Sequence, residues 1–544
     1  MHSMHKRSHS SGRRLRHGTD GTNIYTFEYE RRYLKFSTRN APKTFKVMTT
    51  KKKLTNEERR FFALVREATL TNPFSPRRLE IDQLLSENSS SGKGDALIDD
   101  VIDAVKQRIN ALDSSDRGNI NLFNEQDRVL VEAIFSFDFF YTFRKNFDQF
   151  IQDQIVSRDK TYRLPFANDA KEALQKRGFS EESIKGIIEE SYQFRRSFHF
   201  INKRLIGASK AMQRMRSDLW NNIFTHNFQL YRDYLRDRME DFSTLILGET
   251  GTGKGTVASA IGKSGYIPFD IKKNRFLESF TSSFVSINIS QFPETLIESE
   301  LFGHKKGAFT GAIENYDGVF ARCRPHGAIL LDEIGEIPPH LQIKLLQILQ
   351  ERIFYPVGSK KKERFSGRVI AATNRSLDEL RNKGIFRDDF YYRLCSDVIM
   401  VPTLRQRIQE DPEELENLIQ FIIRKMVGRE SPELSLLVKQ TIETQLGPDY
   451  PWHGNVRELE QCARRVLLKK AYTGDQKTAE PNVMSQLTTG MEQGNIPASQ
   501  LMAGYCCLLY DRHNTIEEVA RRTRLDRRTV AKYIKEWNHE ENSL

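Results

Sequence analysis

The sequence has no run of about 18 apolar residues, the length that a helix needs to cross a bilayer. Residues 1–20 are basic and rich in His and Ser but hold no apolar stretch, so they do not read as a secretory signal. The five cysteines form no CxxC pair, which argues against a zinc site and favours reduced thiols. These absences predict a cytoplasmic chain without a membrane span.

Length and charge limit the number and kind of modules. A chain of 544 residues is too long for one hydrophobic core, and a rule of about one domain per 150 residues gives three or four. Hydrophobic residues make up 38% and charged residues 29%, as in globular proteins. The formal net charge of +12 favours a polyanionic partner only modestly, because the total does not say where the charge lies.

The first 46 residues carry 11 Lys or Arg against 3 Asp or Glu, with scattered histidines. Such a composition favours a disordered extension at residues 1–47 over a DNA-binding arm or a metal site. Met48 is an alternative initiator, because a polar leader into a helix follows it.

Residues 48–204 have the pattern of a mainly helical domain, with turn signals at residues 86–94 and a helix stop and restart at Gly178 and Ser180. Within residues 134–151, phenylalanines recur at three- or four-residue steps, which is one face of a helix packed into a core. These are Phe135, Phe139, Phe143, Phe147 and Phe150. What this domain senses cannot be read from these residues.

From Thr244 the pattern changes to short apolar runs that alternate with helical segments. Such runs occupy residues 244–247, 284–287, 328–331 and 369–372. This alternation predicts a parallel α/β sheet. After Gly384 we expect helices only, then a polar linker at residues 472–497.

A Walker A motif follows the first run. Glycines let backbone N–H groups wrap a phosphate chain, and the lysine meets the outer phosphates. The residues expected to bind nucleotide here are Gly248, Glu249, Thr250, Gly251, Thr252, Gly253, Lys254, Gly255 and Thr256. Gly255 stands where a Ser or Thr usually supplies a hydroxyl to Mg²⁺.

A second apolar run ends in Asp332 and Glu333. In phosphoryl transfer, a carboxylate at such a position can hold Mg²⁺ while its neighbour orients and deprotonates the attacking water. We therefore assign Asp332 to the metal and Glu333 to the water.

Residues 298–312 read ESELFGHKKGAFTGA, and their hexapeptide GAFTGA resembles the hallmark of the sigma-54-dependent activators, or bacterial enhancer-binding proteins. The resemblance covers residues 205–471. It implies an AAA+ ATPase whose hexapeptide forms a surface loop that touches the sigma factor. The expected contacts are Gly307, Ala308, Phe309, Thr310, Gly311 and Ala312.

The same resemblance implies further roles. Asn288 matches the residue that holds the catalytic glutamate until ATP is in place, and Asn374 matches sensor I near the γ-phosphate. Arg387 and Arg393 match arginine fingers supplied to a neighbouring subunit, and Arg457 matches sensor II. Members of the family usually carry Glu at the position of Gly255, so glycine is a departure there.

The last 47 residues contain a helix-turn-helix pattern. Thr515 and Glu518 have capping-box spacing, and Asp526 can cap a second helix. Residues 521–535 hold seven basic residues against one acidic residue, which favours DNA binding and resembles the Fis-type module of these activators. The side chains expected to face DNA are Arg527, Arg528, Thr529 and Lys532. Arg524 stands in the turn, where glycine is common.

Together these patterns predict an α/β AAA+ P-loop ATPase core with a helical lid, preceded by a mainly α-helical regulatory region and followed by an all-α helix-turn-helix domain. The expected ranges are 1–47 for the extension, 48–204 for the regulatory domain, 205–400 for the ATPase core, 401–471 for the lid, 472–497 for the linker and 498–544 for the DNA-binding domain.

The expected function is a cytoplasmic transcription activator that uses ATP and Mg²⁺. Its expected partners are the sigma-54 RNA polymerase holoenzyme, double-stranded DNA, copies of itself in a hexameric ring and an unknown effector. Two alternatives are an AAA+ remodelling ATPase of another class, which has no use for GAFTGA, and a DNA-binding regulator without ATPase-driven activation.

Overall fold

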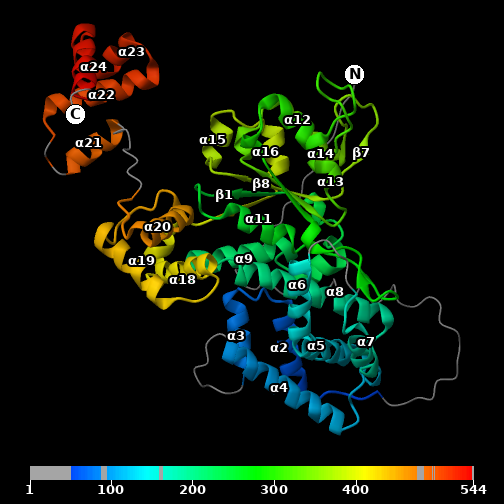
Figure 1. Ribbon diagram of the computed structural model, residues 1–544. Helices are drawn as coiled ribbons and strands as arrows, with labels where there is room; N and C mark the ends of the chain where they lie inside the picture. Colours follow the sequence, from blue (N-terminus) through cyan, green and yellow to red (C-terminus); the bar gives the residue numbers. More distant parts are fainter. Residues whose placement is uncertain are drawn as a thin grey trace, which may run out of the picture. The chain divides into compact units, whose positions relative to one another are not determined.

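The computed structural model describes residues 51–86, 95–157, 163–474, 483–492, 494 and 496–541 (Figure 1). The basic extension expected at residues 1–47, the alternative start Met48 and most of the turn expected at residues 86–94 lie outside these ranges. The chain divides into two units, Met1–Lys52 and Lys53–Leu544, and every element below belongs to the second.

Helices α2 to α8 build the region before residue 199. Their bounds are Asn56–Leu70 for α2, Pro76–Leu85 for α3, Asp95–Ser114 for α4, Glu125–Thr142 for α5, Arg144–Ser157 for α6, Ala167–Lys176 for α7 and Glu181–Phe198 for α8. The start of α2 is fixed by a capping box, in which the Thr55 hydroxyl accepts from Glu58 N and the Glu58 carboxylate accepts from Thr55 N. The stop and restart predicted at Gly178 and Ser180 is confirmed, since Ser180 caps α8.

The phenylalanine stripe runs over two helices, so the prediction of a single helix is wrong. The chain leaves helical geometry at Phe143, whose N–H still reaches Phe139 O, and α6 starts at the next residue. Phe143 stacks on Phe166, with ring centroids 5.6 Å apart. Placement of the stripe in the core is confirmed, because Phe147 is fully buried and Phe150 nearly so.

The segment that follows joins the helical region to the sheet. A π-helical turn at His199–Lys203 leads to α9 (Lys210–Phe224), α10 (Phe228–Leu230) and a second π-helical turn at Tyr231–Leu235. Phe194 of α8 packs on Trp220 and Phe224 of α9. The Gln193 amide donates to Tyr231 Oη and to Ser264 O, at 2.7 and 3.0 Å. The helical region and one face of the sheet thus share one core.

The sheet has five parallel strands in the order β4-β5-β8-β1-β9. Their bounds are Phe284–Asn288 for β4, Ala328–Asp332 for β5, Arg368–Thr373 for β8, Thr244–Leu247 for β1 and Asp397–Met400 for β9. The four apolar runs of the sequence are therefore confirmed as strands. Strand β9 was missed, and the expectation of helices only after Gly384 is wrong there, because on this edge strand only Ile399 is buried.

Alternate residues of the strands face two different cores. Leu245 and Leu331 face the core shared with α12 (Glu294–Phe302), α14 (Pro339–Glu351), α15 (Leu377–Asn382) and α16 (Asp388–Leu394). Ile246 and Leu330 face the core shared with α9 and α11 (Lys254–Gly262). Figure 1 shows these two groups of helices on opposite sides of the sheet.

Four helices after β9 form a separate core around Trp452 and Leu459. They are α17 (Leu404–Glu410), α18 (Glu413–Val427), α19 (Pro432–Gln445) and α20 (Asn455–Lys469). A buried ion pair links them to the chain before α9. Arg407 Nε donates to Glu414 Oε1 at 2.6 Å, and Arg407 Nη2 donates to Ile206 O at 2.6 Å.

Arg407→Ala should lower the free energy of unfolding by about 3 to 5 kcal/mol, because it leaves the fully buried Glu414 without its cation. Denaturant unfolding followed by circular dichroism measures this. Lys425→Ala is the matched control on α18, since its pair with Glu460 is mostly exposed, and it should have a much smaller effect. Equal losses for the two variants would contradict the assignment.

The C-terminal part contains α21 (Val483–Glu492), α22 (Ala498–His513), α23 (Ile516–Thr523) and α24 (Arg527–Glu541). The range expected to be linker, residues 472–497, therefore holds a helix, and Leu487 of α21 is buried in a cluster with Ala503 and Trp537. Across the described residues, no helix is long and apolar enough to span a membrane. Cys323, Cys395, Cys462 and Cys506 are free thiols.

Candidate active site

The phosphate loop lies between the end of β1 and the start of α11. Gly251 and Gly253 have φ of +81° and +100°, a region that glycine adopts without strain. Gly253 is the N-cap of α11 and gives no side-chain cap, so the first N–H groups of the helix remain available to an anion. The Lys254 ammonium donates to Gly248 O at 2.9 Å and to Glu249 O at 3.3 Å. The loop therefore has the geometry of a phosphate cradle.

The pKa of the Lys254 ammonium is influenced by three other charged residues that were predicted to belong to the site. Lys254 is largely buried, and burial lowers its pKa. The nearby carboxylates of Glu333 and Asp332 raise the pKa, and the Arg457 guanidinium lowers it. The structure thus brings together the Walker lysine, both acids and the predicted sensor II arginine.

The two acids stand at the carboxyl end of β5. Asp332 Oδ1 accepts from Glu333 N at 3.1 Å, and Glu333 has φ of +54°, in the left-handed region. Such a conformation is uncommon for residues other than glycine and clusters at functional sites. Asn288 is the register partner of Asp332, and its side-chain oxygen accepts from Ser290 N at 3.0 Å. The expected pairing of Asn288 with Glu333 stays a prediction.

Asn374 follows the end of β8, the strand between β5 and β1. Its side-chain amide donates to Thr250 Oγ1 in the phosphate loop at 3.3 Å. The predicted sensor I residue therefore lies against the phosphate loop, within reach of a terminal phosphate.

Helices α17 to α20, the predicted lid, contact the phosphate loop through Asn455, a residue that was not predicted from the sequence. The Asn455 amide is fully buried and donates to Thr250 O at 3.0 Å and to Glu249 Oε2 at 3.1 Å, while its oxygen accepts from Leu404 N at 2.8 Å. The side chain thus joins the loop to α17 and α20. Its place two residues before Arg457 was the only signal in the sequence.

Glu249 serves the same contact between loop and lid. Both of its carboxylate oxygens accept from the Arg405 guanidinium, with Nη1 2.9 Å from Oε2. That pairing lowers the pKa of Glu249 and keeps it charged. Any phosphate contact from this residue must therefore come from its backbone. Gly251 completes the contact, because a Cβ there would collide with Gly454 O.

The hexapeptide at residues 307–312 forms a tight loop away from the phosphate cradle. Gly307 N donates to Ala312 O at 2.8 Å, and Gly311 has φ of +104°. Phe309 is 39% exposed and Thr310 is exposed beside it, whereas Ala312 is buried. The tip of the loop therefore presents a phenyl ring and a hydroxyl to the surroundings.

A second hairpin supports this loop, and nothing in the sequence indicated it. Strands β6 (Ile353–Phe354) and β7 (Glu363–Arg364) flank its turn. Lys305 N donates to Val357 O at 3.0 Å, and a Cβ built on Gly358 would lie 2.7 Å from Ala308 Cβ. Gly358 therefore lets the hairpin pack directly on the hexapeptide.

Residues 224–400, which contain the phosphate loop, both acids and the hexapeptide loop, match the family model described as "Sigma-54 interaction domain". These residues are a sigma-54 interaction domain. The resemblance to sigma-54-dependent activators drawn from the motif is confirmed, and the five-stranded sheet with its helices is the AAA+ core expected for that family.

Three relatives align with this region. The chain is 42% identical to the Nif-specific regulatory protein of Azotobacter vinelandii over 226 residues, which are 42% of this chain and 40% of the relative. It is 37% identical to the DNA-binding transcriptional regulator NtrC of Rhizobium meliloti, over 48% of this chain and 47% of the relative. Nitrogen fixation protein AnfA of Azotobacter vinelandii is 38% identical over 58% and 52%. The chain thus spans about half the length of these relatives.

Of the two predicted arginine fingers, Arg387 directly precedes α16 of the sigma-54 interaction domain and Arg393 lies on that helix. The Arg387 guanidinium is about half exposed and pairs with Asp389 through Nη2 at 2.9 Å. Arg393 Nε donates to Leu349 O at 2.9 Å, at the end of α14. Within the described residues neither guanidinium is bonded to the phosphate loop of its own chain. The structure therefore does not bring Arg387 and Arg393 together with the other predicted residues of the nucleotide site.

Beyond the sigma-54 interaction domain, α23 and α24 form the two helices of the expected helix-turn-helix. Val519 and Val530 are fully buried between them, and Arg524 has φ of +58° in the turn. Asp526 caps α24 by accepting from Arg528 N and Thr529 N. The capping box expected at Thr515 is wrong, because its side chain makes no capping bond.

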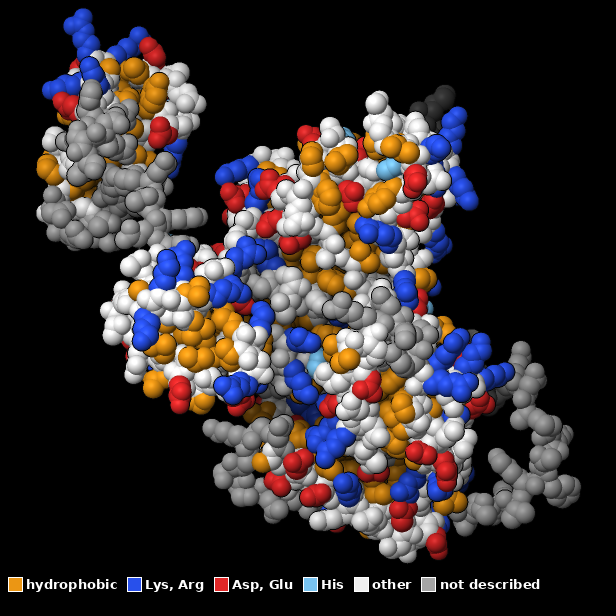
Figure 2. Space-filling view, in the orientation of Figure 1, with side chains coloured by type: hydrophobic (Ala, Val, Ile, Leu, Met, Phe, Trp, Pro, Cys, Tyr) orange, Lys and Arg blue, Asp and Glu red, His pale blue; other side chains and the backbone are white. Residues whose placement is uncertain are grey.

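The predicted DNA-facing side chains differ in exposure. Arg527 and Lys532 are about 70% exposed and Arg528 is exposed, whereas Thr529 donates its hydroxyl to Asp526. Figure 2 shows Lys and Arg side chains on the visible face of these helices. Their roles toward DNA remain predictions.

Proposed function

We propose that this protein is a transcription activator that couples ATP hydrolysis to remodelling of the sigma-54 RNA polymerase closed complex. The observation that carries this proposal is the exposed GAFTGA tip held in the same domain as a phosphate loop, two acids and two sensor residues. An exposed tip remote from the phosphate cradle can act on a partner, whereas the cradle alone would serve any ATPase.

The donors of the site fit ATP and Mg²⁺. The glycine-rich turn and the open N-terminus of α11 fit a phosphate chain, and Lys254 adds the cation that such a chain requires. Asp332 is the carboxylate placed to hold Mg²⁺, which supplies charge neutralisation at the phosphates. Glu333 accepts the proton of the attacking water, and Asn374 and Arg457 orient the terminal phosphate.

We further propose that the active form is a ring of six copies, in which Arg387 and Arg393 reach a neighbouring subunit's nucleotide. Their positions at the start of and within α16, where neither is bonded to its own phosphate loop among the described residues, support this. Spreading of charge over the transferred phosphoryl group makes such fingers worth about 10³ to 10⁵ in rate.

Arg387→Ala should lower steady-state ATPase activity by about 10³-fold with little change in nucleotide affinity. Because the Arg387 guanidinium bonds only to the exposed Asp389 among the described residues, its loss should not affect folding. Mixing Arg387→Ala with Lys254→Ala should restore part of the activity, since mixed rings place an intact loop beside an intact finger.

Arg424→Ala, an exposed arginine on α18, is the control and should retain parental activity. Absence of any recovery in mixtures whose joint assembly has been verified would contradict fingers that act between subunits.

The remaining modules complete the proposal. The helix-turn-helix binds double-stranded DNA through Arg527, Arg528, Thr529 and Lys532, and it holds the ring near its promoter in the cytoplasm. The helical region within residues 48–204 receives a signal and passes it to the ATPase core, with which it shares a hydrophobic core.

Reconstituted transcription tests the function as a whole. With purified sigma-54 holoenzyme, a sigma-54 promoter carrying an upstream binding site and ATP, the protein should produce heparin-resistant open complexes. It should produce none with a non-hydrolysable ATP analogue. ATP hydrolysis without open complexes would favour a remodelling ATPase of another class, and DNA binding without hydrolysis would favour a regulator that does not use ATP.

A further inference from the structure

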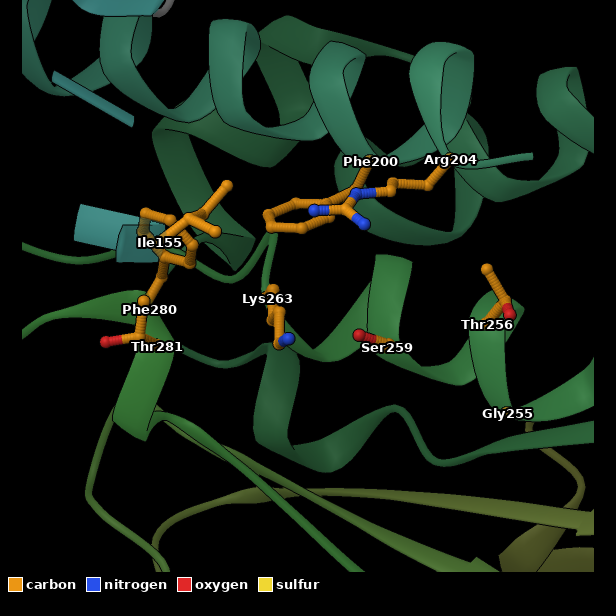
Figure 3. A pocket seen from close by; sticks show the side chains of 9 residues that line it. All are labelled: Ile155, Phe200, Arg204, Gly255, Thr256, Ser259, Lys263, Phe280 and Thr281. Atoms are coloured by element: carbon orange, nitrogen blue, oxygen red, sulfur yellow. The ribbon is translucent and has the colours of Figure 1, made fainter. Parts of the chain in front are cut away.

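A cavity of about 520 Å³ lies between the helical region and α11 (Figure 3). One wall comes from the π-helical turn that follows α8, through Phe200 and Arg204. The opposite wall is one face of α11, where Thr256, Ser259 and Lys263 recur at three- and four-residue steps. Its size is that of a small-molecule site.

The end of the cavity near Lys263 combines apolar surface with positive charge. Phe200 and Phe280 are buried aromatic residues, and Ile155 of α6 closes the same end. Lys263 Nζ lies 5.6 Å from the centroid of the Phe200 ring. Figure 3 shows Arg204 reaching from the opposite wall across the cavity.

Arg204 and Lys263 form no ion pair with any described Asp or Glu, because no carboxylate of those residues lies within 4 Å of either cation. Burial lowers the pKa of Lys263, and the positive charge of Arg204 lowers it further. An anion between the two groups would relieve both effects.

This end of the cavity is separate from the phosphate cradle. Gly255 and Thr256, next to the Walker lysine, form one end of the cavity, and Lys263 lies at the other end of α11. Lys263 lies nine positions after Lys254, which is about 13.5 Å at 1.5 Å per residue. A nucleotide in the cradle can reach only the near end.

We propose that the cavity binds a small organic anion with an aromatic or apolar body. Its acidic group lies between Arg204 and Lys263, with the Ser259 hydroxyl as a donor, and its body packs on Phe200, Phe280 and Ile155. A molecule there touches the helical region and the helix that begins at the Walker lysine, so it can link the two. The proposal does not depend on the activity toward sigma-54.

Fluorescence titration of the full chain with 1-anilinonaphthalene-8-sulfonate, an aromatic sulfonate, tests the proposal in the presence of saturating Mg-ADP. The parent should bind the probe at one site. Lys263→Met, which keeps the aliphatic stem, and Arg204→Met should each weaken binding at least about 10-fold. Lys469→Met, an exposed lysine at the end of α20, is the control and should stay within about twofold.

The uncharged analogue N-phenyl-1-naphthylamine should bind the parent and Lys263→Met equally, because only the acidic group meets the cations. Parental affinity of both variants for the sulfonate would overturn the proposal. So would probe binding that is seen without nucleotide and lost in saturating Mg-ADP, which would make the cavity part of the nucleotide site. Melting curves identify misfolded variants, and if Lys263→Met misfolds, the exposed Arg204→Met decides the result.

Discussion

Glu333→Gln should bind ATP with near-parental affinity and hydrolyse it about 10² to 10⁴-fold more slowly, the usual contribution of a positioned general base. The amide keeps the size of the side chain and its left-handed backbone but cannot accept a proton from water. Asp332, Lys254 and the glycine turn, which hold metal and phosphates in the proposal, are unchanged.

Steady-state phosphate release and binding of a fluorescent ATP analogue measure the two properties separately. Glu336→Gln is the matched control, three residues along, where the carboxylate pairs with Arg375 at the surface. It should retain parental turnover. Near-normal turnover of Glu333→Gln would show that this residue is not the general base. Loss of ATP binding would instead mean that its charge is needed to keep Lys254 in position for the nucleotide.

The parts of the fold that were predicted correctly are those in which a run of apolar residues in the sequence forms a buried element of the structure. Strands β1, β5 and β8 lie inside the sheet and are covered on both faces, so nearly every residue is apolar, and the edge strand β4 still carries an apolar run at residues 284–287. Strand β9 lies at the other edge, begins with the exposed Asp397 and buries only Ile399, so its four residues gave too short a signal. Helix periodicity located the phenylalanine core but did not locate the break at Phe143, a residue that stacks on the distant Phe166.

In the site too, residues within short motifs could be predicted, whereas residues that reach the site from distant parts of the sequence could not. The phosphate loop and the acids could be predicted because their chemistry is contained in short motifs. Asn455 and Arg405 could not, because each contacts the phosphate loop across more than 150 residues of sequence. The cavity was equally hidden, since its walls come from α6, the turn after α8, α11 and the segment before β4.

The hexapeptide loop and the two acids are both connected to β5 and its neighbour β4. The loop follows α12, which succeeds β4, and the chain then enters β5, whose last residues are the two acids. A change at Glu333 or Asn288 on hydrolysis can therefore reach the loop through short connections. Coupling of this kind requires that the loop differ in position between nucleotide states.

Thr310→Ala should leave ATPase activity intact and abolish open-complex formation at a sigma-54 promoter. Thr310 lies at the exposed tip, and no hydrogen bond to its hydroxyl holds the described structure together. Its truncation should change the free energy of unfolding by no more than about 0.5 kcal/mol, as is usual for surface positions. The variant should also fail to bind sigma-54 holoenzyme in the presence of a transition-state analogue of ATP hydrolysis.

Thr444→Ala makes the same substitution on the exposed face of α19 and should behave like the parent in all three assays. This control separates loss of one threonine from loss of the contact at the tip. If Thr310→Ala forms open complexes as the parent does, the tip does not transmit force to the polymerase, and the exposed loop no longer supports the proposed function. If instead ATPase activity falls with it, the loop is coupled to the cradle within the domain and must stabilise the hydrolytic state even without the sigma factor.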